Sequence, residues 1–157
     1  MVKYLIMDVD GTLTDGKIYM SPSGEAMKAF NIKDGCGIHD LLIPVGIVPV
    51  IITSRTSEIV MNRCKEIGIT EVYQGVKDKL QKLSEVCEES YDTVAYIGDD
   101  INDLPCMNMV LTEGGIVGCP ADAVESVIRI ANYVAPHNGG NGAVRDFIEW
   151  VIQFSVK

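Results

Sequence analysis

Apolar and polar positions follow one another along this chain in blocks typical of strands separated by helices. Short apolar runs, such as residues 4–9 and 47–53, have the length and composition of buried strands. In residues 57–67 the apolar positions recur near helical spacing, and Gly68 then supplies a helix stop. This alternation predicts an α/β protein with a mostly parallel sheet and crossover helices on both faces.

The remaining elements are predicted in the same way. Residues 17–20 and 26–32 flank the turn segment SPSGE and predict a β-hairpin inserted after the first strand. Further strands are predicted at 71–74, 93–97 and 132–134, and further helices at 37–45, 77–90, 121–130 and 142–154. With no repeat or long linker, we expect residues 1–157 to form one domain, with the hairpin at about residues 16–31.

Composition narrows the class of protein. A net charge of −9 argues against nucleic acid as the main partner, because that affinity depends on lysine and arginine neutralising phosphates. The five cysteines are scattered without C-x-x-C spacing, which predicts buried thiols in a reducing compartment. The longest apolar run, residues 41–52, contains two prolines and is shorter than the roughly 20 residues that a membrane span needs. We expect a cytoplasmic protein without a membrane partner.

Polar residues follow several of the predicted strands. Asp8 and Asp10 follow the first strand, Thr53 follows the second, Lys79 opens a helix, and GDDIND (98–103) follows another strand. Taken singly, Thr53 suits a helix N-cap, Lys79 suits a solvated helix residue, and GDDIND suits an acidic turn. In open parallel sheets, however, ligands bind beyond the carboxyl ends of the strands. Because all of these polar residues are expected at that one edge of the sheet, they predict a single site.

These residue types suit phosphate chemistry. A carboxylate such as Asp8 can attack phosphorus and form an aspartyl-phosphate. Asp10, two residues further on, can protonate the leaving oxygen and then deprotonate the attacking water. Thr53 and Lys79 would bind the phosphoryl oxygens, and Lys79 adds charge where it develops in the transition state.

Crowded carboxylates repel one another and therefore need a cation. Hard oxygen ligands together with a substrate phosphate suit Mg²⁺. Asp8, the backbone carbonyl of Asp10, and Asp99 are the candidate protein ligands, and Asp103 would hold Lys79 or complete the outer shell of the metal.

The motifs DVDGTLTDG and GDDIND, with Thr53 and Lys79 between them, resemble the four motifs of the haloacid dehalogenase superfamily. The resemblance implies a modified Rossmann fold, bound Mg²⁺, Asp8 as the nucleophile and Asp10 as the acid/base.

A closer resemblance covers nearly the whole chain. It is carried by TDG, FNIKDGCGI, VYQGVKDKL, AYIGDDIND and GGNGAVRDF, which are similar to the 3-deoxy-octulosonate 8-phosphate phosphatases and their acylneuraminate 9-phosphate relatives. This family implies a phosphorylated sugar acid as substrate and no cap domain. It also implies a homotetramer that is assembled by the hairpins, in which neighbouring subunits help to cover each active site.

The same resemblance implies a set of substrate contacts. They are Asp10, Asn31, Ile32, Lys33, Asp34, Gly35, Ser54, Arg55, Arg63 and Lys79. A guanidinium at Arg55 can fork onto a sugar-acid carboxylate, whereas Arg63 is equally well explained as an ordinary helix-surface arginine. The chain departs from the family at Ser54, where glycine is usual, at Cys36, where an aromatic is usual, and at His39, where the octulosonate enzymes carry arginine.

Other classes of protein stay open. A receiver-type phospho-acceptor domain also places carboxylates, a hydroxyl and a lysine around Mg²⁺, but its acidic pair precedes the acceptor and it lacks a general acid such as Asp10. A phosphatase-derived tetramerisation module, as found with sialic acid cytidylyltransferases, would not need every catalytic group. The D-x-D site of a glycosyltransferase does not predict Thr53 and Lys79. The segment HNGGNG (137–142) is either a plain loop or one that closes over substrate.

Overall fold

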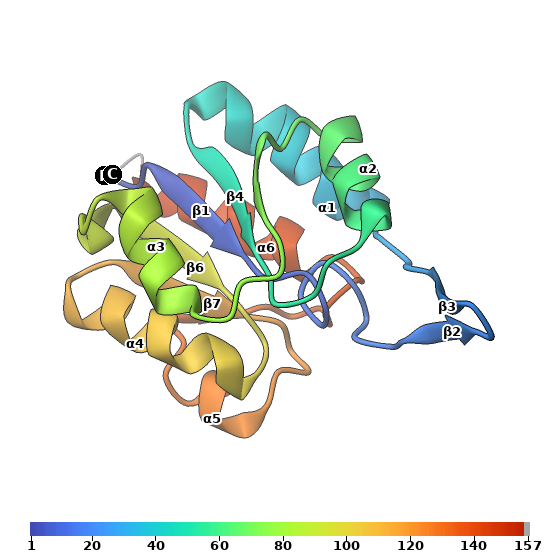
Figure 1. Ribbon diagram of the computed structural model, residues 1–157. Helices are drawn as coiled ribbons and strands as arrows, with labels where there is room; N and C mark the ends of the chain where they lie inside the picture. The colour runs from blue at the N-terminus through green and yellow to red at the C-terminus, as the bar shows by residue number, and fades with distance from the viewer. Residues whose placement is uncertain (156–157) are drawn as a thin grey trace.

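The computed structural model describes residues 1–155, and its centre is a six-stranded parallel sheet (Figure 1). The strands are β1 (Tyr4–Met7), β4 (Val48–Ile52), β5 (Glu71–Tyr73), β6 (Val94–Ile97), β7 (Ile116–Cys119) and β8 (Tyr133–Val134), in the spatial order β5-β4-β1-β6-β7-β8. Every neighbouring pair is parallel. The α/β class and the mostly parallel sheet are confirmed, but strand β7 was not among the predicted strands.

Helices connect the strands. They are α1 (Ile32–Cys36), α2 (Glu58–Glu66), α3 (Lys79–Cys87), α4 (Leu104–Thr112), α5 (Glu125–Ile128) and α6 (Ala143–Ser155). Two predictions need correction. The helix expected at 37–45 is a π-type turn, η1 (Gly37–Leu42), followed by a 3₁₀ turn, η2 (Ile43–Val45), because Pro44 and Gly46 stop regular helix there. The helix expected at 121–130 is only the single turn α5.

The sheet buries both faces, and its side chains alternate between two apolar layers. Leu5 and Met7 of β1 pack on one side with residues of η1, α2 and α6. Ile6 points to the other side, into a layer with residues of α3, α4 and α5. Because successive strand side chains alternate in direction, a strand covered on both faces reads as one continuous apolar run. None of the helices in residues 1–155 is long and apolar enough to cross a membrane.

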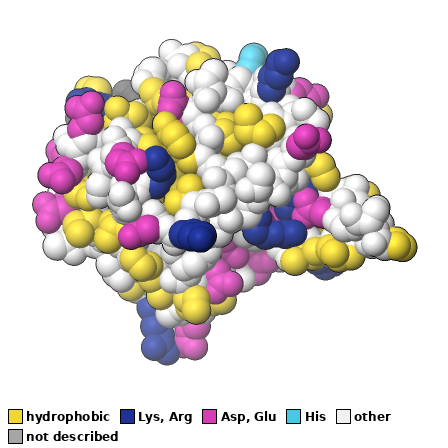
Figure 2. Space-filling model, viewed as in Figure 1, with side chains coloured by type: hydrophobic (Ala, Val, Ile, Leu, Met, Phe, Trp, Pro, Cys, Tyr) yellow, Lys and Arg dark blue, Asp and Glu magenta, His cyan; other side chains and the backbone are white. Residues whose placement is uncertain are grey.

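A β-hairpin leaves the body of the molecule after β1. Its antiparallel strands β2 (Tyr19–Ser21) and β3 (Gly24–Met27) form a separate two-stranded sheet that projects to one side (Figure 1). The hairpin is confirmed, although its second strand ends at Met27, short of the predicted residue 32. Ile18, Met20 and Met27 are each more than half exposed. Hydrophobic side chains therefore lie along this projecting element, as Figure 2 shows.

The five cysteines are free thiols. Cys64, Cys87, Cys106 and Cys119 are buried, and burial raises the pKa of Cys106 to about 12. Cys36 is exposed, so the expectation that all thiols are buried is wrong at that position. The reason is its place on α1, where the buried positions are Asp34 and Gly35.

Helix α6 is fixed to the sheet by stacked aromatic rings. Phe147 is fully buried, and its ring centroid lies 6.0 Å from that of Tyr133 on β8 and 5.9 Å from that of Trp150. Phe154, one helix turn beyond Trp150, is exposed.

We predict that Phe147→Ala lowers the free energy of unfolding by about 3–5 kcal/mol, because it removes a buried ring and leaves a cavity. Phe154→Ala is the matched control on the same helix and should cost no more than about 1 kcal/mol. Urea denaturation followed by circular dichroism measures both values. Equal losses in the two variants would contradict the assignment of Phe147 as the anchor of α6.

Candidate active site

The site is formed where three neighbouring strands end. Met7 pairs with Ile51 of β4 on one side and with Ile97 of β6 on the other, so the chain leaves all three strands at one edge. Asp8, Thr53 and Asp99 follow these strands and are brought together there. Parallel pairing in this order therefore creates the predicted cluster from distant parts of the sequence.

Lys79 lies at the centre of the cluster and is buried. Its ammonium is 3.1 Å from Asp8 Oδ1 and 3.0 Å from Asp103 Oδ1. Burial acts to lower the pKa of Lys79, but the two carboxylates outweigh it and raise the pKa above its ordinary value. The first residue of α3 therefore holds a permanent positive charge against Asp8, and Asp78 caps this helix by accepting from the Gln81 amide at 2.9 Å.

Asp103 is fully buried, and protein donors occupy both of its oxygens. Oδ1 accepts from Lys79 and from the Tyr96 hydroxyl at 2.8 Å, while Oδ2 accepts from the Asp99 amide at 3.0 Å. Of the two roles considered for Asp103, this geometry supports the one in which it holds Lys79.

Asp8, Asp99 and Asp103 can each offer an oxygen within 4.8 Å of the others. Burial is the main cause that raises the pKa of Asp8 to about 6 and that of Asp99 to about 7, and repulsion between carboxylates adds to it. With all three ionised and Lys79 charged, the cluster carries two uncompensated negative charges. This donor set suits a divalent cation such as Mg²⁺, which prefers carboxylate oxygens.

The DGT segment after the first strand brings its backbone against Asp99. Gly11 has a φ of +86°, and a Cβ atom there would lie 2.0 Å from Asp99 Oδ2. Thr12 then donates its hydroxyl to Asp99 Oδ1 at 3.1 Å. Only glycine fits at position 11. Thr12, which was not among the predicted site residues, orients a candidate metal ligand. Its place in the D-x-D-G-T motif was the available signal.

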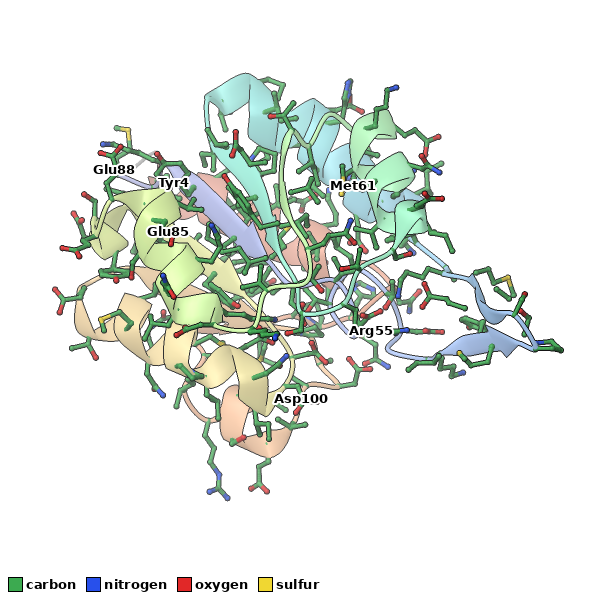
Figure 3. All side chains as sticks on the ribbon, in the orientation of Figure 1. Tyr4, Arg55, Met61, Glu85, Glu88 and Asp100 are labelled. Atoms are coloured by element: carbon green, nitrogen blue, oxygen red, sulfur yellow. The ribbon has the colours of Figure 1, made fainter. Side chains whose placement is uncertain are left out.

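A cavity of about 170 Å³ opens above Asp8. It is lined by Asp8, Asp10, Thr53, Ser54, Arg55, Asp100 and Asn102. Figure 3 shows Arg55 close to the base of the hairpin and Asp100 on the neighbouring loop. The structure thus gathers Asp8, Asp10, Thr53 and Arg55 around one space. Asp100 and Asn102 were missed as lining residues, although GDDIND contains them.

The predicted substrate loop 31–35 is a helix turn instead. Asn31 caps α1, its side-chain oxygen accepting from the Lys33 amide at 2.8 Å, and Ile32 is exposed. Asp34 is buried and accepts from the Arg145 amide, near the start of α6, at 2.9 Å. Its carboxylate caps α6 and is not among the residues that line the cavity over Asp8, and a substrate contact by Asp34 or Gly35 stays a prediction.

Arg63 and Gly35 lie together in a different place. The Arg63 guanidinium covers Gly35, pairs with Glu66 at 2.8 Å and lies 5.9 Å from the centre of the Phe30 ring. Phe30, Gly35 and Arg63 line a separate cavity of about 10 Å³, together with Asn31 and Asp34. Within residues 1–155 this arrangement does not place Arg63 in the Asp8 cavity, and a substrate contact by Arg63, Asn31, Ile32 or Lys33 stays a prediction.

The glycine-rich segment 137–142 packs against the segment that follows β1. A Cβ atom on Gly139 would lie 1.9 Å from the Gly11 carbonyl oxygen, and the Gly140 amide donates to the Thr12 carbonyl at 3.2 Å. His137 pairs with Asp146 at 2.8 Å. This close backbone packing favours the interpretation of 137–142 as a structural loop over one that closes over substrate.

Comparison with known proteins agrees with this geometry. No family model matches the chain. The 3-deoxy-D-manno-octulosonate 8-phosphate phosphatase of Escherichia coli K12 is 42% identical over 154 residues, which cover 96% of this chain and 79% of that protein.

Solved structures give the same result. The Moraxella catarrhalis phosphatase of the same name, in complex with magnesium, phosphate and the sugar acid KDO, is 37% identical with a TM-score of 0.89, over 97% of this chain and 86% of that one. A Legionella pneumophila hydrolase of HAD superfamily subfamily III A is 35% identical with a TM-score of 0.85, over 97% and 82% of the two chains.

The parallel sheet and the acidic cluster at its carboxyl edge define a hydrolase of the haloacid dehalogenase superfamily. Within it, the chain belongs to the 3-deoxy-D-manno-octulosonate 8-phosphate phosphatase family, whose members are phosphoric monoester hydrolases.

Because the Asp34 carboxylate that caps α6 is buried, the stability of the fold should depend on pH. Burial raises the pKa of Asp34 to about 6, and Asp34 Oδ2 has no hydrogen-bond partner within residues 1–155. Because the pKa is higher in the folded chain than in the unfolded one, the stability that the protonated form contributes is lost as the pH rises from about 4 to about 6.

We expect wild type to lose on the order of 2 kcal/mol relative to Asp34→Asn between about pH 4 and pH 7. Urea unfolding of both proteins at each pH measures this difference, in which the titration of Asp8 and Asp99 cancels. A difference that does not change with pH would show that Asp34 is ionised in the folded protein throughout this range.

Proposed function

We propose that this protein is a Mg²⁺-dependent phosphatase that hydrolyses the phosphate monoester of a sugar acid. The octulosonate 8-phosphate is the first candidate, and a nonulosonate 9-phosphate such as acylneuraminate or KDN 9-phosphate is the second. The observation that carries this proposal is the Asp8 carboxylate, which is held by Lys79 at the floor of a cavity that Asp10 and Thr53 also line. The named activity of the 42% identical relative supports the octulosonate.

The reaction follows from the roles of two carboxylates. An Asp8 oxygen attacks phosphorus, the bond from phosphorus to the ester oxygen breaks, and the Asp10 carboxyl gives its proton to that oxygen. Asp10, now a carboxylate, then takes a proton from water. The resulting hydroxide attacks the aspartyl-phosphate, which frees Asp8 and releases inorganic phosphate. A Mg²⁺ ion held by Asp8, Asp99 and the backbone carbonyl of Asp10 would supply positive charge near the phosphoryl oxygens.

We expect two further residues, Thr53 and Lys79, to bind the phosphoryl group. Thr53 is buried and lines the cavity. Its backbone is fixed by hydrogen bonds with the backbone of Tyr73 and Val76. Lys79 carries a fixed charge directly beside the nucleophile. Such preorganised donors act most strongly on charge that develops in the transition state.

Arg55 supports a sugar acid as the substrate. Its guanidinium lines the cavity and is partly exposed, so it can reach a carboxylate on the far side of a bound phosphate ester. The related Moraxella structure, which holds magnesium, phosphate and KDO, supports the same class of substrate.

The other functional classes make different predictions. A receiver domain keeps its phosphoryl group and needs no acid at the position of Asp10. A purely structural tetramerisation module needs neither Lys79 in a buried pair nor a cavity over Asp8. The charge network around Lys79 and the cavity both favour an enzyme.

Substrate preference tests the function. We expect kcat/KM to be highest for octulosonate 8-phosphate in a panel that includes acylneuraminate and KDN 9-phosphates and simple esters. Asp8→Asn should abolish turnover with Mg²⁺ present, a loss of at least about 10⁴-fold, because no nucleophile remains. Removal of Mg²⁺ with EDTA should do the same in wild type.

Asp92→Asn is the matched control, because Asp92 is exposed near the opposite edge of the sheet, just before β6. Substantial activity in Asp8→Asn would remove the assignment of the nucleophile. A uniformly low profile across the panel would favour the structural module.

The hairpin supports a homotetramer in which neighbouring subunits cover the active sites. We expect wild type to form a tetramer in light scattering after size-exclusion chromatography, and Met20→Glu to dissociate it by placing a charge in an apolar contact. Met61→Glu is the control, because Met61 is an exposed methionine on α2, away from the hairpin (Figure 3). A monomeric wild type, or equal dissociation of both variants, would contradict the hairpin interface.

A further inference from the structure

Lys28 follows the exposed hairpin, and the residue as a whole is half-buried. Its side chain is only 3% exposed, although strand β3 ends at the preceding residue. The ammonium lies 2.6 Å from Asp10 Oδ1 and 3.1 Å from Glu25 Oε2. A lysine is seldom buried unless its charge is paired, so these two carboxylates account for its position. The predicted site did not include Lys28 or Glu25.

Glu25 is the second carboxylate that contacts the Lys28 ammonium. Its carboxylate accepts from the Ser57 hydroxyl at 3.1 Å and pairs with Arg55 Nη2 at 3.1 Å. Arg55 and Ser57 belong to the loop after β4, so Glu25 joins the hairpin to the rim of the cavity. Basic and acidic side chains lie together where the hairpin meets the body (Figure 2).

This arrangement makes the two oxygens of Asp10 different. An ammonium can only donate hydrogen bonds, so Asp10 Oδ1 must act as an acceptor towards Lys28. Among residues 1–155, Asp10 Oδ2 has only the longer contact of 3.8 Å with Arg55 Nη1. Oδ2 is therefore the oxygen free to carry a proton, and Asp10 lines the cavity above Asp8.

We propose that Lys28 is a positioning residue for the hydrolysis: by binding Oδ1 it holds Asp10 with Oδ2 directed at the ester oxygen of the substrate. The proton that leaves with the alcohol then comes from Oδ2, and the same oxygen takes the proton of the attacking water. This inference rests on the proposed function. It assigns to the hairpin a part in the chemistry of its own subunit.

A merely structural Lys28 would tie the hairpin to the body and affect all substrates alike. A positioning Lys28 matters most where the leaving group needs a proton. A sugar alkoxide is a poor leaving group that depends on Asp10, whereas p-nitrophenolate leaves without protonation. The value of kcat/KM reports the steps up to departure of the alcohol, so it isolates proton donation from the later hydrolysis.

The experiment compares Lys28→Met with wild type on a sugar-acid phosphate and on p-nitrophenyl phosphate, with Mg²⁺ present. We expect kcat/KM for the sugar phosphate to fall by at least about ten-fold, and for p-nitrophenyl phosphate by no more than about three-fold, because general acid catalysis contributes roughly 10²–10⁴-fold. Lys17→Met is the matched control, since Lys17 is an exposed lysine of the same insertion. It should leave both values unchanged.

Equal losses on both substrates, or no loss on either, would overturn the proposal. If Lys28→Met does not fold, Lys28→Arg carries the same comparison, because it keeps the charge but moves the donors away from Oδ1. A wild type that hydrolyses neither substrate would instead refute the proposed function, so the two failures are distinguishable.

Discussion

The pairing of Lys79 with Asp8 and Asp103 is the constraint around which the site is built. Three carboxylates within 4.8 Å would repel one another strongly in a buried setting, and the ammonium at 3.1 and 3.0 Å from two of them removes part of that cost. To reach this position Lys79 must be the first residue of α3, and Asp103 must be held by Tyr96 and the loop after β6. The remaining negative charge is what makes the site suitable for a divalent cation.

Backbone packing beneath the cluster is as demanding as the charges above it. Gly11 passes so close to Asp99 that no side chain fits, and Gly139 touches the carbonyl of Gly11 from the other side. The backbone at Gly11 is therefore held between the Asp99 carboxylate and the glycine-rich segment 137–142, which lies more than a hundred residues later in the sequence. Asp34 secures the start of α6, directly after that segment, by accepting from the Arg145 amide. Residues distant in the sequence thus determine where Asp8 and Asp10 lie.

The sequence predicted the structure well where local motifs carry the chemistry. It predicted the structure poorly where the fold brings together residues that are distant in the sequence. The apolar runs predicted β1, β4 and β6, and the polar residues after them predicted the cluster, because parallel strands end at one edge. Strand β7 was missed because Ile116–Cys119 is short, contains a glycine and lacks flanking polar alternation. The contact of Asp34 with the Arg145 amide was not predicted, because it spans 111 positions. The contact of Lys28 with Asp10, which lies 18 positions earlier, was not predicted either.

An acidic protein has to concentrate its few cations to bind an anion. This chain carries a net charge of −9, yet Lys28, Arg55 and Lys79 all lie within contact distance of Asp8 or Asp10. Each of these three cations is paired with a carboxylate of the protein. A ligand that carries little charge therefore gains little binding free energy by replacing that carboxylate. Under the proposed function, a phosphate ester that also carries a carboxylate would offer one negative charge to Lys79 and another to Arg55. Because both cations are already paired, we expect the site to favour such substrates over ligands that carry less charge.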